Sequence, residues 1–173
     1  MATPSHSSSE ETGSPLRARR HARQLTLQML FQHEFHPNDP SWQEKFWAKQ
    51  AATPEVKDFA LQLFQGVLDH QQDIDSMIGT FAVGWVLDRM PVVDRNILRV
   101  SIYELFWEAE IPAMVTINEA VELAKRFADD EARRFVNGLL DHILRVDARL
   151  SGKRTEADIP PVSPNDTFTQ SRS

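Results

Sequence analysis

The sequence predicts one all-α domain, a compact arrangement of six or seven helices between two disordered tails. Apolar residues recur at helical spacing through almost all of the central part of the chain, and no run alternates strictly between apolar and polar residues as a half-buried strand would. The 173 residues, of which 41% are hydrophobic and 25% charged, suffice for one domain with an apolar core and are too few for two comfortable ones.

The domain is expected over residues 16–150. Residues 1–15 are rich in Ser and Thr, and residues 151–173 carry prolines among polar side chains. Both segments contain too few apolar residues to offset the entropy that is lost on ordering a chain. We therefore predict a disordered tail at each end.

Two helices are expected in the first third of the domain. The first carries apolar residues at i, i+4, i+7 and i+11 and stops before two prolines. The stripe consists of Ala18, Ala22, Leu25 and Met29, and the prolines are Pro37 and Pro40. Ser41 with Glu44 three residues later has the spacing of a capping box, which predicts a short second helix.

The central helices are predicted from their first residues. Thr53 as N-cap and Pro54 at the first helical position open a third helix. A short helix is expected over 73–81 and a single turn over 84–87, and Pro91 starts a strongly apolar helix that runs to Trp107.

Two more helices complete the domain. Pro112 ends the preceding region, and the spacing of Thr116 and Glu119 is that of another capping box. Asp129 or Asp130 is expected to cap the last helix. Its buried face is predicted to hold Phe135, Val136, Leu139, Leu140, Ile143 and Leu144.

Composition argues against several functional classes. The absence of cysteine excludes disulfides, thiolate metal sites and cysteine nucleophiles, and it fits a reducing cytoplasm. No signal peptide or membrane-spanning stretch is evident. Glycine-rich phosphate loops and nucleophile motifs are missing, so we predict no catalytic residues and no cofactor. The segment His33-Glu34-Phe35-His36 lacks metalloprotease spacing and a third ligand, so no metal site is predicted.

A basic cluster stands at the start of the first helix in an otherwise acidic chain. Residues 17–23 contain four arginines, one histidine and no acid, whereas the whole chain has a net charge of −6. Arginine matches phosphate with a planar fork of donors, and the first turn of a helix adds unpaired N–H groups. RNA binding is the favoured interpretation; a role in solubility, or pairing with acids such as Glu10 and Glu11, is the alternative.

Asn137-Gly138 interrupts the apolar pattern of the last helix. A glycine inside a helix costs about 1 kcal/mol relative to alanine, which suggests that something approaches the backbone closely. Another helix is the commoner explanation. The functional one is a platform of Phe135, Asn137 and the preceding arginines that stacks on and hydrogen-bonds to an unpaired base.

Taken together, these segments resemble the NusB family of bacterial transcription antitermination factors, over about residues 16–146. The matching stretches are Arg19-Arg20-His21-Ala22-Arg23, Val93-Asp94-Arg95 with Ile97-Leu98-Arg99, Tyr103-Glu104-Leu105, Ile117 to Lys125, and Phe135-Val136-Asn137-Gly138-Leu139-Leu140, with Trp85, Leu87 and Arg89 leading into the second. The chain departs from the family pattern at His21 and at Met114, where a basic residue is common.

The resemblance implies two small helical bundles, no catalysis and a heterodimer with NusE, a small-subunit ribosomal protein. The pair would bind single-stranded boxA RNA of nascent ribosomal RNA, within an elongation complex that holds other Nus factors. By motif, RNA would meet Arg19, Arg20, His21, Arg23, Arg134, Phe135 and Asn137, and the partner side would hold Phe31, Asp94 and Arg95.

Two alternatives stay open. The chain could be a stand-alone protein-interaction bundle, or a detached RNA-recognition domain related to the NusB-like domain of ribosomal RNA methyltransferases. Those enzymes need a cofactor-binding domain and a catalytic cysteine, and this chain has neither.

Overall fold

The computed structural model describes residues 14–154, and within that range every regular element is helical. The elements are α1 (Pro15–Phe35), α2 (Trp42–Trp47), α3 (Pro54–Asp69), α4 (Gln71–Phe81), η1 (Leu87–Arg89), α5 (Val92–Trp107), α6 (Ala113–Phe127), α7 (Asp130–Val146) and η2 (Ala148–Lys153), where η marks a 3-10 helix. The predicted all-α class is confirmed. None of these helices is long and apolar enough to cross a membrane.

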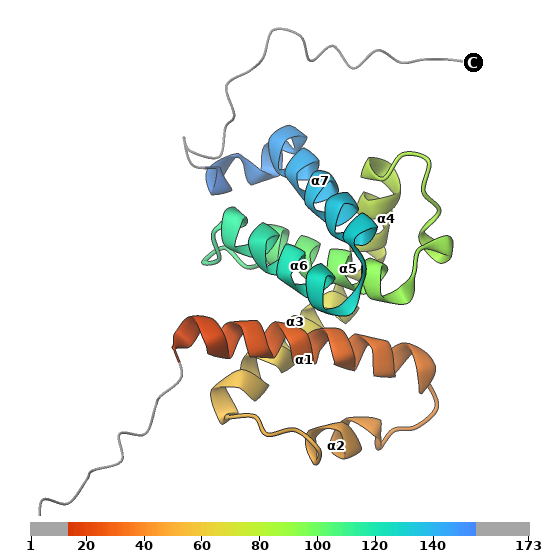
Figure 1. Cartoon of the computed structure of the whole chain (residues 1–173), viewed down its shortest axis with the longest axis vertical. Coiled ribbons are helices and arrows are strands. Elements are labelled where there is room, and N and C mark those ends of the chain that lie inside the picture. Colours follow the sequence, from red (N-terminus) through yellow and green to blue (C-terminus); the bar gives the residue numbers. More distant parts are fainter. Residues whose placement is uncertain (1–13, 155–173) are drawn as a thin grey trace, which may run out of the picture.

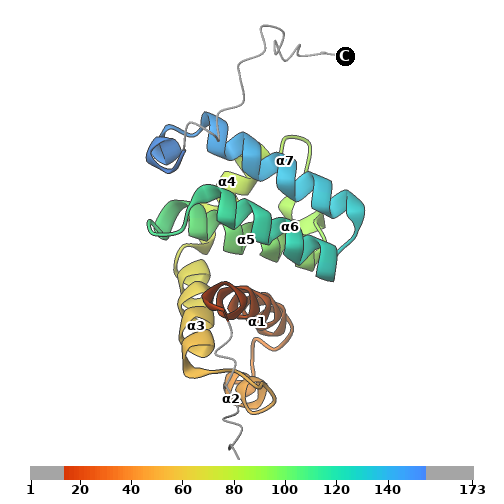
Figure 2. The same cartoon turned by 60° about the vertical axis from the view of Figure 1, so that its left-hand side comes forward.

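The helices form two groups that meet at α5. Figures 1 and 2 show α1, α2 and α3 in one group and α4 to α7 in the other. α5 packs against α1 and α3 on one side and against α4, α6 and α7 on the other. Its residues from Asn96 to Leu105 are all buried, polar ones included. A helix that is buried on every side must pair its charged residues inside the protein.

The observed caps confirm some predicted helix starts and correct others. Thr53 accepts a hydrogen bond from the backbone N–H of Val56, as expected for an N-cap. Ser41 makes no side-chain cap and instead donates to Asp39. The second predicted capping box is also wrong, because the N-cap of α6 is Pro112, four residues before Thr116.

α3 and α5 come into close contact at Gly66. The ring of Tyr103 occupies the space that a Cβ atom of residue 66 would need, so any other residue there would force the ring to move. Burial, and after it the negative charge of Glu108, raises the pKa of Tyr103 to about 12.

The folded domain extends beyond residue 150, where the sequence predicted it to end. η2 continues to Lys153, whose Nζ donates to the backbone oxygens of Glu104 and Glu108 at 2.8 and 2.6 Å. Both carbonyls, at and just after the C-terminal end of α5, also accept a backbone N–H, so Lys153 gives each a second, charged donor. Helix α1 likewise begins at Pro15, inside the predicted tail. The rest of both predicted tails, residues 1–13 and 155–173, lies outside the described residues.

Candidate nucleic-acid interface

The basic residues at the start of α1 point toward different neighbours. Successive residues of an α-helix are about 100° apart, so a run of arginines cannot face one side. Arg17, Arg19 and Arg20 are exposed, His21 is half-buried, and Arg23 is buried. The cluster is therefore a set of distinct sites and must be taken residue by residue.

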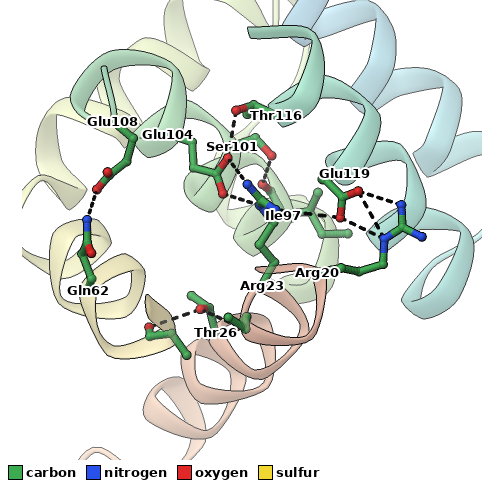
Figure 3. Close-up of polar contacts among 12 residues, drawn as sticks. Arg20, Arg23, Thr26, Gln62, Ile97, Ser101, Glu104, Glu108, Thr116 and Glu119 are labelled. Atoms are coloured by element: carbon green, nitrogen blue, oxygen red, sulfur yellow. Dashed lines mark hydrogen bonds and ion pairs between the residues drawn. The ribbon is translucent and has the colours of Figure 1, made fainter. Parts of the chain in front are cut away.

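Arg20 reaches toward α6 and pairs with Glu119 (Figure 3). Its Nη2 lies 2.7 Å from Oε1 of Glu119, and its Nε lies 3.2 and 3.1 Å from the two carboxylate oxygens. The hydrogen bond, and then the charge of Glu119, raises the pKa of Arg20. The arginine side chain is still 48% exposed. Arg20 is thus held in position with part of its guanidinium open to an approaching phosphate.

Arg19 leans toward α3 instead. Its guanidinium carbon lies 4.5 Å from the centre of the Phe59 ring, a cation–π contact that limits the motion of the side chain. The residue remains exposed. Arg19 and Arg20 therefore present charge on both sides of the α1 axis.

Arg23 does not face the solvent, which corrects the prediction that it meets RNA phosphates. Its side chain is 4% exposed and pairs with Glu104 of α5 through Nε at 2.5 Å and Nη2 at 3.1 Å (Figure 3). Thr116 donates to the same carboxylate at 2.8 Å. A buried glutamate in the last turn of α5 needs these donors. Arg23 is a structural residue that ties α1 to α5.

The second predicted part of the interface lies in the first turns of α7. Asp129 caps the helix by accepting from the backbone N–H of Ala132 at 2.8 Å. Arg134 and Asn137 are exposed, and Phe135 is half-buried. The amide of Asn137 lies 3.4 Å from Asp141, at the long limit of a hydrogen bond. An exposed cation, an aromatic ring and an amide thus come together within four residues.

Gly138 completes this segment, and the close-packing explanation for it is wrong. The residue is exposed, and a Cβ atom built on it would meet nothing within 4 Å. Within residues 14–154, no other helix approaches the backbone at Gly138.

Helix α6 separates the two parts of the predicted interface. In both Figures 1 and 2, α6 lies between α1 and α7. The structure thus places the arginines of α1 and the Phe135 segment on helices that flank α6, and it does not bring their side chains together. An RNA strand that meets both must cross α6.

The residues predicted for the partner side come from α1 and α5. Phe31 is 41% exposed, and its ring lies 4.6 Å from that of the exposed Phe35. Phe31 also lines a pocket of about 520 Å³ between α1, α2 and α5. Asp94 lies in the first turn of α5, where burial, and then the charge of Asp129, raises its pKa.

Arg95 is engaged inside the protein, which corrects its predicted role as a partner contact. Its Nη2 lies 2.7 Å from Oε2 of Glu34, and its Nη1 donates to the backbone oxygen of Leu87 at 3.3 Å. The side chain is 13% exposed. Arg95 joins the end of α1 to the segment that precedes α5. Glu34 therefore forms ion pairs with Arg95 and Arg99. Residues 14–154 contain no cluster of three side chains that could bind a metal ion.

Sequence reasoning missed three residues that define the site. The capping-box spacing of Glu119 predicts a helix start, but the residue pairs with Arg20. Glu104 appears in the sequence only within a family motif; its place as an acid in the apolar run of α5 is the signal that a buried cation lies nearby. Trp85, whose ring centre lies 4.8 Å from that of Phe135, has no sequence signal that joins the two.

Comparison with known proteins gives one consistent result. A family model described as the NusB family matches residues 20–145. A protein called "Transcription antitermination protein NusB" from Streptomyces avermitilis is 42% identical over 144 residues, which cover 81% of this chain and 99% of the relative. A relative with the same name from Bacillus velezensis is 46% identical over 129 residues, covering 72% and 94%.

Solved structures agree with the sequence matches. A structure described as T. maritima NusB aligns with a TM-score of 0.67 and 38% identity, covering 74% of this chain and 91% of the other. A second structure, of the antitermination factors NusB and NusE in complex with dsRNA, aligns with a TM-score of 0.66 and 27% identity, covering 75% and 97%.

Proposed function

Because the chain belongs to the NusB family, we propose that it is a transcription antitermination factor that binds single-stranded boxA RNA of nascent ribosomal RNA together with NusE. The observation that carries the proposal is the pair of exposed, positioned arginines, Arg19 and Arg20, at the start of α1 in a chain of net charge −6. We infer no catalytic activity.

The two segments have different tasks in this proposal. The arginines of α1 attract and position the phosphate backbone, a contact that carries no sequence information. The exposed side chain of Asn137 can hydrogen-bond to a base edge, and the ring of Phe135 can stack on a base. Arg134, next to both, supplies a further phosphate contact.

NusE is proposed to dock where Phe31, Phe35 and Asp94 are found. The two phenylalanines form an exposed apolar pair, which is costly in water unless a partner covers it. Asp94 adds a charge that a basic partner residue could neutralise. Arg95 is not part of this surface, since it is engaged with Glu34. The complex would then act within the elongation complex with other Nus factors.

A gel-shift titration with boxA RNA, with and without NusE, at several salt concentrations tests the proposal. Contacts from Arg17, Arg19, Arg20 and Arg134 predict that log K falls with log salt at a slope of about −3, from about −0.7 per phosphate contact. Affinity that does not depend on salt, or no binding of the RNA even with NusE, would refute it.

Two variants and one control sharpen the test. Arg20→Ala should weaken RNA binding and reduce the salt slope by about 0.7. Glu119→Gln should strengthen binding, because it removes the carboxylate that competes with phosphate for Arg20. Arg145→Ala, at the exposed C-terminal end of α7, should change little. Equal RNA binding by all three variants would instead favour a protein-interaction bundle.

A further inference from the structure

The segment between α4 and α5 exposes an aromatic ring next to the proposed base-reading residues. Trp85 is 47% exposed, although large apolar side chains of a single domain tend to be buried. Its ring centre lies 4.8 Å from that of Phe135, with the planes tilted by 38°. The two rings come from residues fifty positions apart, so the fold places them together.

The backbone around Trp85 is fixed by specific contacts. Gly84 has a φ of +84°, a conformation that residues with a side chain rarely adopt, and it lets the chain turn. The N–H of Trp85 donates to the carbonyl of Ala82 at 3.0 Å. Arg95 donates to the carbonyl of Leu87, two residues further on. The backbone that carries the ring is therefore held in place, and the ring itself packs against Phe135, which lowers the entropic cost of binding.

The surface of α7 beside this ring pair is open. Gly138 lies one turn after Phe135, and His142 one turn further, so the three share a face of the helix. The ring of His142 packs against Phe81 at 5.9 Å. The glycine lies between the two aromatic pairs, and no neighbouring atom of the part of the chain that the structure describes lies within 4 Å of its Cβ position. Glycine lowers the stability of a helix, and no packing contact requires it at this exposed position. Because it has no side chain, it leaves room beside the two rings.

We propose that Trp85, Phe135 and the open surface over Gly138 form the seat of one unpaired nucleobase of the bound RNA. This inference rests on the proposed function and adds two residues to it. Stacking needs an accessible aromatic ring with room beside it: Trp85 is 47% exposed, and the Cβ position of Gly138, one turn after Phe135, meets no neighbouring atom of the described residues within 4 Å. Arg134 and Asn137, exposed on the same turns of α7, supply the phosphate and hydrogen-bond contacts that accompany a stacked base. These polar neighbours favour RNA over a protein partner.

Substitution of Gly138 by leucine gives the sharpest test, because it fills the seat and leaves the fold intact. Leucine has a higher helix propensity than glycine and meets no atom at this position, so thermal stability should stay equal or rise. Affinity for boxA RNA in the presence of NusE should fall about tenfold. Gly79→Leu is the matched control: it is also an exposed helical glycine without neighbours near its Cβ position, and RNA affinity should be unchanged.

Trp85 is tested with a pair of variants and a modified RNA. Trp85→Ala should weaken binding about tenfold, as expected for one lost base–aromatic stack, whereas Trp85→Phe should retain most of the affinity. An abasic site is placed at each position of the RNA in turn, and the position that weakens binding identifies the seated nucleotide. With that abasic RNA, Trp85→Ala should cause no further loss of affinity.

The outcomes separate this inference from the proposed function. If the unsubstituted chain with NusE binds no boxA RNA, the proposed function fails and the inference fails with it. If that chain binds normally and Gly138→Leu and Trp85→Ala bind equally well, the inference alone is overturned. Weaker binding of NusE by Trp85→Ala, with RNA affinity unchanged when NusE is saturating, would also overturn it and assign the ring to a protein contact.

Discussion

Replacing Arg23 by methionine should destabilise the domain instead of only weakening RNA binding. The substitution keeps the apolar stem and removes the guanidinium, which leaves Glu104, 1% exposed, with Thr116 as its side-chain donor. Removing one partner of a buried ion pair costs about 3–5 kcal/mol. For a chain of this length, that corresponds to a fall in Tm of about 10–15 °C.

Urea unfolding followed by circular dichroism measures this cost, and a second substitution identifies its cause. Arg23→Met combined with Glu104→Leu removes both buried charges, so most of the lost stability should return, with a deficit of about 1 kcal/mol for the hydrogen bond of Thr116. Non-additivity of this kind is the signature of a direct contact.

Arg20→Met is the control, since Arg20 is half exposed and its pair with Glu119 is partly open to solvent. Its effect on the free energy of unfolding should stay within about 1 kcal/mol, while RNA affinity falls. If Arg23→Met instead left the unfolding midpoint unchanged and lowered RNA affinity as Arg20→Met does, the assignment of Arg23 as structural would be refuted.

Three further predictions concern other parts of the fold. Gly66→Ala should lower Tm markedly in a melting experiment, because the new Cβ overlaps the ring of Tyr103; an unchanged Tm would contradict the close contact. Asp94→Asn should raise Tm at pH 7 and leave it unchanged near pH 3. Burial and Asp129 raise the pKa of Asp94 in the folded state, so the native state binds more protons and stability falls as pH rises through the raised value. Lys153→Met should cost about 1.5–3 kcal/mol in urea unfolding, since the carbonyls of Glu104 and Glu108 lose a charged donor; no loss would argue against this contact.

The helices were predictable because their signals are local. Periodicity, the prolines and the side-chain caps at Thr53 and Asp129 act within a few residues, and each of these signals corresponds to a feature of the structure. Local patterns failed where a tertiary contact competes for the same side chain. Thr116 and Glu119 have capping-box spacing, yet they lie within α6 and serve Glu104 and Arg20.

The residue types of the candidate site could be predicted from the sequence, but their arrangement in space could not. The sequence shows basic residues at 17–23, but it cannot show which acid each arginine meets, since Glu104 and Glu119 follow 81 and 99 positions after their partners. A carboxylate deep in α5 withdraws Arg23 from the surface, whereas one at the edge of α6 only steadies Arg20. Depth of burial, which the linear pattern does not encode, separates the two roles.

Gly66 in α3 and Gly138 in α7 also show that the sequence alone does not reveal depth of burial. Gly66 and Gly138 each lie inside a helix, where glycine carries a similar cost in either sequence context. Gly66 is explained by the fold, because Tyr103 occupies its Cβ position, but nothing in the described part of the chain fills the space at Gly138. Gly79 in α4 is open in the same way, so an open glycine alone does not indicate a ligand; Gly138 differs because the ring pair of Trp85 and Phe135 lies one turn away. Alanine at position 66 should therefore damage the fold, whereas leucine at position 138 should damage only the binding of RNA.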